Sequence, residues 1–150
     1  FLTILESIGI PSQYHEQIRK NYENHAKLNA HKIRLYDGVN ELLKHCQNNN
    51  VKCSIVTSKS RERTFNILSE YFGEIKFSSV VTPESVKANR GKPYADQLLQ
   101  SCLESGSSPS DTLYVGDMEV DYQCAKNASV SFAHALWGYG SHQKYQRYLS

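Results

Sequence analysis

The chain has 150 residues, the size of one ordinary domain, and its 39% hydrophobic and 21% charged residues are typical of globular rather than disordered proteins. Its formal net charge of +2 is too small, and its lysines and arginines too scattered, to indicate a nucleic-acid partner. Its apolar runs are much shorter than a bilayer span, so no membrane partner is expected. The 4 cysteines lack a C-x-x-C spacing, which favours reduced thiols in a cytoplasmic protein.

Two helices are predicted at the start of the chain. Apolar residues recur at helical spacing over residues 1–8, and Gly9 is a typical C-terminal stop. The second helix, over residues 12–28, is mostly polar. This composition predicts a peripheral layer rather than a core element.

From Tyr36 onward, segments of strand and helix character alternate. Strands are expected over residues 51–56, 77–81, 111–115 and 130–133. Helices are expected over residues 39–46, 61–71, 93–103, 118–127 and 143–149. The alternation predicts βαβ units, and therefore an α/β fold with a Rossmann-like, doubly wound parallel sheet.

Two carboxylates, Asp117 and Asp121, stand four residues apart where the third expected strand gives way to a helix. The apolar run Leu113–Val115 is typical of a buried core strand, and Gly116 permits a tight turn after it. Both carboxylates would then converge at the edge where open α/β sheets bind ligands. The pair suits Mg²⁺, which is usually held by one or two carboxylates plus a substrate phosphate. Alternatively, Asp117 is a helix cap and Asp121 a solvated surface acid.

Other polar residues occupy comparable positions in the chain. Thr57 and Ser58 end the first expected strand and offer hydroxyls and N–H groups suited to an anion, while Lys92 stands just before a helix. Together with the two acids, this set matches phosphoryl transfer, in which catalysis is largely positioning and charge neutralisation. The alternatives are that Thr57 and Ser58 cap a helix and that Lys92 is an ordinary surface lysine.

These motifs, in this order, resemble those of the haloacid dehalogenase (HAD) superfamily, and within it the phosphoglycolate phosphatase type. The resemblance covers about residues 35 to 140 and rests on Tyr36-Asp-Gly38 with Leu42-Leu43, Ile55-Val-Thr57-Ser-Lys59, Gly91-Lys92-Pro93, Val115-Gly-Asp117 through Asp121, and Trp137-Gly-Tyr-Gly140. It implies that residues 1–34 are part of a small helical cap and that residues 35–150 are a HAD-like α/β core.

The resemblance also implies a role for each candidate residue. Thr57 would hydrogen-bond the transferring phosphoryl group, with Ser58 beside it in the substrate site, and Lys92 would neutralise the charge of the phosphoryl group and the nucleophile. Asp117 and Asp121 would hold Mg²⁺, directly or through water, and this acid pair favours a phosphatase over a dehalogenase. The implied substrate is a small phosphorylated metabolite, and the implied enzyme is a monomer or a homodimer.

The superfamily's first motif, D-x-D-x-T or D-x-D-x-V, does not occur in this chain. In the superfamily it ends the first core strand and supplies the nucleophilic aspartate of an aspartyl-phosphate mechanism. We therefore expect that aspartate to precede Phe1, the core to lack its first strand, and residues 1–150 alone to be inactive. The alternatives are a non-catalytic HAD-fold binding or regulatory domain, and a phosphomutase or phosphonatase of the same fold.

Overall fold

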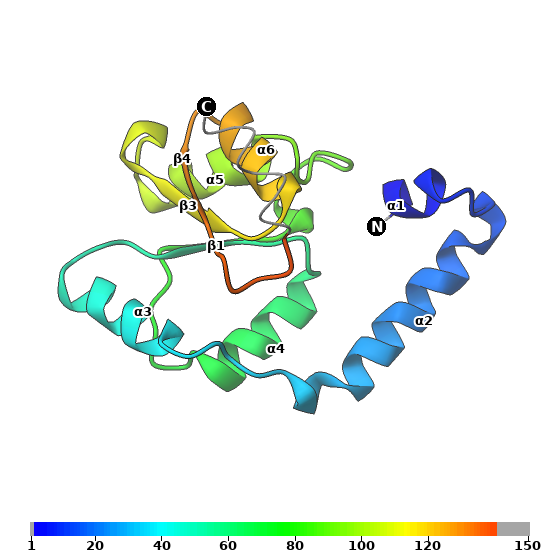
Figure 1. Cartoon of the computed structure of the whole chain (residues 1–150), viewed down its shortest axis with the longest axis horizontal. Coiled ribbons are helices and arrows are strands. Elements are labelled where there is room, and N and C mark those ends of the chain that lie inside the picture. Colours follow the sequence, from blue (N-terminus) through cyan, green and yellow to red (C-terminus); the bar gives the residue numbers. More distant parts are fainter. Residues whose placement is uncertain (1, 141–150) are drawn as a thin grey trace. The chain divides into compact units, whose positions relative to one another are not determined.

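The computed structural model describes residues 2–140 (Figure 1), so the helix expected over residues 143–149 lies outside the described residues. The chain divides into two compact units, Phe1–Leu35 and Tyr36–Ser150. Among the described residues, no helix is both long enough and apolar enough to cross a membrane.

The first unit is helical. It contains α1 (Leu2–Ser7), α2 (His15–Leu28) and two short 3-10 helices, Ser12–Tyr14 and Ala30–Lys32. The imidazole of His15, which is buried, lies 2.7 Å from the carbonyl oxygen of Ile10 and so ties α2 to the turn before it. Arg19 forms ion pairs with Glu16 and Glu23 on the exposed side of α2, as expected for a mostly polar helix. That this unit is part of a cap stays a prediction.

Helices and strands alternate in the second unit, as the sequence predicts. The elements are α3 (Val39–Asn48), β1 (Ser54–Val56), α4 (Arg61–Tyr71), β2 (Ser79–Val81), α5 (Asp96–Ser105), β3 (Leu113–Gly116), α6 (Glu119–Asn127) and β4 (Ser131–His134), with 3-10 turns at Pro83–Ser85 and Pro109–Asp111. The expected start of α5 at Pro93 is wrong. Residues 91–94 form a separate turn, closed by a hydrogen bond from the Tyr94 N–H to the Gly91 carbonyl oxygen, and the helix begins after it.

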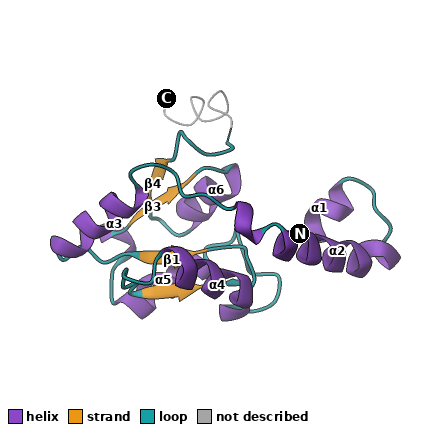
Figure 2. Cartoon of the chain, turned by 90° about the horizontal axis from the view of Figure 1, so that it is seen from below, coloured by secondary structure: helices purple, strands orange, loops and turns teal. Residues whose placement is uncertain are grey.

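The strands form two parallel pairs. β1 pairs with β2 in the register Ile55 opposite Val80, and β3 pairs with β4 in the register Tyr114 opposite Phe132. Figure 2 shows the two pairs, in orange, as separate pieces of sheet. Within the described residues, β1 and β3 each have a strand neighbour on one side only.

The core lies where α5 packs on β1 and β2 and α6 packs on β3 and β4. Its buried side chains are Leu98, Cys102, Cys124, Ala125, Ala128 and Val130, and Val56, Ala95, Tyr114 and Phe132 pack against them. The expectation that Leu113–Val115 is a buried run is wrong for two of its three residues. Leu113 is 60% exposed and Val115 52% exposed, because successive side chains of β3 lie on opposite faces of the strand and Tyr114 lies on the face that packs on the core.

A groove of about 530 Å³ is lined by residues of both β1 and β3. Ser54 and Val56 contribute from β1, and Leu113 and Tyr114 from β3, while α5 adds Leu98, Ser101 and Cys102. Across it, the Tyr114 hydroxyl lies 3.5 Å from the carbonyl oxygen of Val56. The open edges of the two strand pairs therefore border one groove.

Candidate active site

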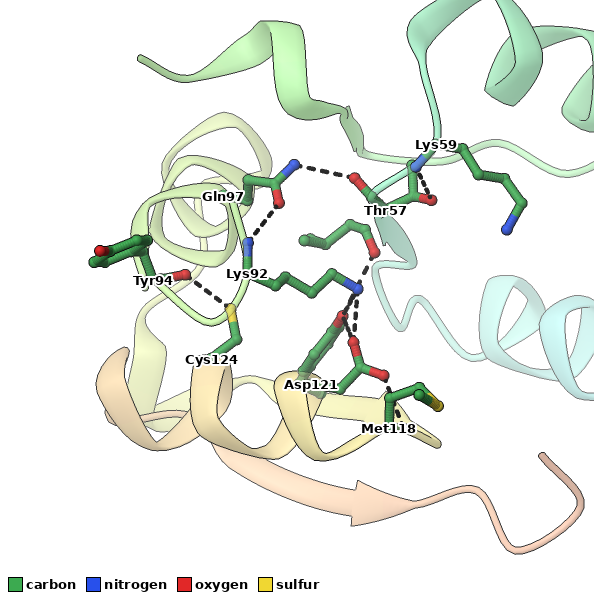
Figure 3. A network of polar contacts seen from close by, with 10 residues as sticks. Thr57, Lys59, Lys92, Tyr94, Gln97, Met118, Asp121 and Cys124 are labelled. Atoms are coloured by element: carbon green, nitrogen blue, oxygen red, sulfur yellow. Dashed lines mark hydrogen bonds and ion pairs between the residues drawn. The ribbon is translucent and has the colours of Figure 1, made fainter. Parts of the chain in front are cut away.

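The candidate residues occupy loops and helix starts that follow or precede the core elements. Thr57 and Ser58 directly follow β1, Lys92 precedes α5, Asp117 follows β3, and Asp121 lies in the first turn of α6. Figure 3 shows the polar network that connects several of them.

Lys92 and Asp121 form a shielded ion pair. The Lys92 Nζ lies 2.7 Å from Asp121 Oδ1, and Asp121 is only 5% exposed. Lys92 Nζ also donates a hydrogen bond of 2.7 Å to the Tyr114 hydroxyl, which donates one of 3.1 Å to the same Oδ1. The other carboxylate oxygen accepts the Met118 N–H at 3.1 Å. The alternative of a solvated Asp121 is therefore wrong, and so is that of Lys92 as an ordinary surface lysine.

The backbone at the end of β3 makes this burial possible. A Cβ on Gly116 would lie 2.5 Å from the Asp121 Cβ, so only glycine lets the Asp121 side chain lie this close to the strand. The same carboxylate caps α6, whose N-cap residue is Met118. The alternative assignment of Asp117 as the helix cap is therefore wrong.

Asp117 is held by the loop that follows β4. The Tyr139 N–H donates a hydrogen bond of 2.8 Å to Asp117 Oδ2. A Cβ on Gly138 would overlap the Asp117 side chain, and one on Gly140 would overlap the Asp117 main-chain carbonyl. The loop thus closes around Asp117 in a way that requires glycine at both positions.

Asp117 and Asp121 offer carboxylate oxygens, the donors that a hard divalent cation prefers, and both oxygens of Asp121 already accept hydrogen bonds from the chain. Within residues 2–140 there is no group of three or more His, Cys, Asp or Glu side chains that could hold a metal by itself. Mg²⁺ does not need one, because it usually keeps several waters and takes one or two carboxylates plus a substrate phosphate. Zinc, which prefers three or four nitrogen or sulfur ligands, would not be satisfied here.

Gln97 connects the loop after β1 to the lysine. Its side chain is fully buried, its Nε2 donates to the Thr57 carbonyl oxygen at 3.0 Å, and its Oε1 accepts the Lys92 N–H at 3.3 Å (Figure 3). One amide therefore fixes the spacing between two segments that supply candidate phosphate ligands.

The hydroxyl of Thr57 accepts the Lys59 N–H at 3.1 Å, which turns the chain sharply after β1. Ser58 is exposed at the tip of this turn. Neither residue caps α4, because the N-cap position is Ser60. Both hydroxyl groups are therefore placed in the loop after β1 rather than at the helix end.

Burial raises the pKa of the Tyr114 hydroxyl well above its usual value, and the negative charge of Asp121 raises that pKa further. The hydroxyl is therefore protonated at neutral pH. In this state it can accept a hydrogen bond from Lys92 and donate one to Asp121 at the same time.

Sequence reasoning missed Gln97, Tyr114 and the positional role of the glycines at 138 and 140. Gln97 lies four residues before Ser101 on the same face of α5, but the burial of that face is seen only in the structure. Tyr114 stands between two apolar residues of a strand, and this sequence pattern does not show whether its hydroxyl group has a polar partner. Gly138 and Gly140 could be found only as parts of an already recognised motif.

Residues 3–135 match the family described as haloacid dehalogenase-like hydrolase, and the chain belongs to this family. Phosphoglycolate phosphatase of Xylella fastidiosa (strain 9a5c) is 32% identical over 108 residues, which are 72% of this chain and 46% of that protein. N-acetylmuramic acid 6-phosphate phosphatase of Pseudomonas aeruginosa is 27% identical over 124 residues, 83% of this chain and 53% of that protein. The chain thus spans about half the length of the curated relatives it matches.

A crystal structure from Lactobacillus plantarum, provisionally described as a phosphoglycolate phosphatase, has a TM-score of 0.85. It is 23% identical to this chain, and the superposition covers 95% of this chain and 67% of that one. The likeness confirms the expected fold class, an α/β HAD core.

Proposed function

We propose that this chain belongs to a Mg²⁺-dependent phosphatase that hydrolyses a small phosphorylated metabolite through an aspartyl-phosphate. The observation that carries the proposal is the network in which Gln97 joins the Thr57 loop to Lys92, and Lys92 pairs with Asp121. The names of the two curated relatives given above, a phosphoglycolate phosphatase and an N-acetylmuramic acid 6-phosphate phosphatase, support it. The proposed substrate is a phosphomonoester, the class to which these two names point.

Each candidate residue has a defined task in this proposal. The Thr57 hydroxyl hydrogen-bonds the phosphoryl group, and the Lys92 ammonium opposes the negative charge that develops on it. Asp117 and Asp121 hold Mg²⁺, directly or through water. When bound, Mg²⁺ supplies further neutralisation of the phosphoryl oxygens. Asp117 is held in place by the Tyr139 N–H, and Asp121 by the Met118 N–H.

We further propose that the nucleophile is an aspartate carried by a strand ahead of Phe1. The groove between β1 and β3 supports this, because a parallel strand placed there would pair with both open edges. Such a strand would end beside the loop after β1 and the turn after β3, where Thr57 and Asp117 stand. We call this chain together with that strand the complete enzyme.

The test is the substitution Asp117→Asn in the complete enzyme, assayed with Mg²⁺ against p-nitrophenyl phosphate and a panel of phosphomonoesters. We expect turnover to be lost while the melting temperature changes little, because Asp117 is half-buried at the edge of the core. Glu104→Gln, at an exposed acid near the end of α5, is the matched control and should retain activity. Removal of Mg²⁺ with a chelator should abolish wild-type turnover, and added Mg²⁺ should restore it.

Full activity of Asp117→Asn would refute the metal assignment. A complete enzyme that hydrolyses no phosphomonoester with Mg²⁺ would refute the proposed activity and favour a non-catalytic HAD-fold binding or regulatory domain.

A further inference from the structure

The ammonium group of Lys92 has two defined partners among the described residues. Its Nζ donates one hydrogen bond to Asp121 Oδ1 and one to the Tyr114 hydroxyl, and each has a donor–acceptor distance of 2.7 Å. An ammonium group has three N–H bonds in a tetrahedral arrangement. With two of them fixed, the direction of the third is fixed as well.

The Tyr114 hydroxyl is the member of this group that constrains the geometry. It accepts from Lys92 and donates to Asp121 Oδ1, so cation, hydroxyl and carboxylate form a closed triangle of hydrogen bonds. An ion pair without the hydroxyl would leave the ammonium free to rotate about one contact. The long, flexible lysine stem offers little resistance to such rotation.

Tyr114 is itself held rigidly. Its ring packs against Phe132 of β4 with ring centres 6.3 Å apart, and the ring is part of the packing around the hydrophobic core. The side chain therefore delivers its hydroxyl to the same point beside the Asp121 carboxylate whatever the state of the lysine. A phenylalanine at 114 would keep this packing and remove only the hydroxyl.

We propose that Tyr114 is a positioning residue that aims the Lys92 ammonium at the substrate phosphate. The proposal rests on the phosphatase function proposed above and deepens it. A preorganised cation is worth most where negative charge develops in the transition state, so loss of the hydroxyl should lower kcat more than it changes KM.

The first test is Tyr114→Phe in the complete enzyme, with kcat and KM measured for p-nitrophenyl phosphate at saturating Mg²⁺. We expect kcat to fall about 10-fold with KM unchanged within about 2-fold, since one hydrogen bond to a charged group is removed. Lys92→Ala should lower kcat by about 100-fold or more. If Tyr114 acts through Lys92, Tyr114→Phe should add less than about 2-fold in the Lys92→Ala background.

Two control variants separate positioning from packing. Tyr122→Phe removes a hydroxyl from another tyrosine whose ring packs on Phe132, and it should leave kcat within about 2-fold of wild type. Phe132→Leu disturbs the packing but keeps the Tyr114 hydroxyl. It should lower the melting temperature, and its loss of kcat should be smaller than that of Tyr114→Phe. Equal losses of kcat in Tyr114→Phe and Tyr122→Phe, or additive losses in the double variant, would overturn the proposal.

A second measurement does not depend on turnover. Acylation of lysine amines by an N-hydroxysuccinimide ester, followed by mass spectrometry, compares Lys92 with Lys44, an exposed lysine of α3 paired with Glu74. The ratio of the acylation rate of Lys92 to that of Lys44 should rise about 3-fold or more in Tyr114→Phe, because the Lys92 amine loses a partner that restrains it. An unchanged ratio would overturn the proposal. If the wild-type enzyme hydrolyses no phosphomonoester, the phosphatase function fails, and the ratio still decides whether Tyr114 restrains Lys92.

Discussion

A single buried amide connects the two loops that carry the candidate phosphate ligands. Gln97 has no exposed surface, and both ends of its side chain bind main-chain groups, the Thr57 carbonyl and the Lys92 N–H. Main-chain groups cannot move without moving the chain, so these bonds set the distance between the loops. A buried, fully satisfied polar side chain of this kind stabilises one arrangement over its neighbours.

Gln97→Met should therefore destabilise the fold by about 1–3 kcal/mol, because it leaves a carbonyl and an N–H without their partner while keeping the side chain's length. Urea unfolding of the complete enzyme measures this. Gln100→Met, in the same helix but at a glutamine whose partner is the exposed Glu104, should change stability by less than about 0.5 kcal/mol. Equal unfolding midpoints for the two variants would show that the hydrogen bonds of Gln97 do not contribute to the stability of the fold.

At the residue scale, the sequence predicts where a residue lies in the fold better than it predicts its hydrogen-bond and ion-pair partners. Thr57, Lys92 and Asp117 follow strands or precede helices, and this is enough to expect them at one edge of the core. The direct contact between Lys92 and Asp121 joins residues 29 positions apart in sequence, a spacing that carries no local signal. Gln97 is missed for a different reason, since a glutamine in a helix is usually solvated.

At the scale of elements, the loop after β4 acts as a clamp on the turn after β3. One main-chain N–H, from Tyr139, binds the Asp117 carboxylate, and glycines on either side allow the two backbones to touch. The clamp connects neighbouring strands of one parallel pair at their carboxyl ends. The placement of Asp117 thus depends on a segment about twenty residues away in sequence.

Gly138→Ala should displace the Asp117 carboxylate, because the added methyl group would occupy its position. We expect the Mg²⁺ concentration needed for half-maximal thermal stabilisation to rise about 10-fold, as for loss of a group that orients a metal ligand. The Mg²⁺ dependence of turnover should shift in parallel. Gly73→Ala is the control, since its added methyl group would meet only the Ser69 carbonyl oxygen at an ordinary 3.5 Å. An unchanged Mg²⁺ midpoint in Gly138→Ala would contradict the clamp.

Element boundaries were predictable where local signals act alone. The helix expected over residues 61–71 has those bounds in the structure, since Ser60 precedes it as N-cap and Gly73 follows soon after its end. β1 begins at Ser54 rather than at residue 51, because the Val51 N–H bonds back to the Cys46 carbonyl oxygen and prolongs the turn after α3. Such a competition between turn and strand is not visible in a pattern of apolar residues.

At the scale of the whole molecule, the second unit has two half-sheets with open edges on one groove. Each half-sheet is covered by a helix, α5 or α6, and the helices share the main hydrophobic cluster. The outer side chains of β3, Leu113 and Val115, are more than half exposed. Open edges and exposed strand faces favour pairing with another strand, and without one they favour aggregation.

Residues 1–150 by themselves should therefore hydrolyse no phosphomonoester above background, since Thr57, Lys92 and the acids can hold a phosphate but are not suited to attack it covalently. They should also melt broadly and aggregate.

A longer version, in which a strand ending in D-x-D is joined ahead of Phe1, should gain solubility, cooperative melting and turnover of p-nitrophenyl phosphate with Mg²⁺. In a third version the first aspartate of D-x-D is replaced by asparagine. It should melt like the longer version but remain inactive, which separates the strand's pairing in the groove from its chemistry. Cooperative unfolding and full turnover by residues 1–150 alone would show that the nucleophile lies within the chain and that the groove needs no added strand.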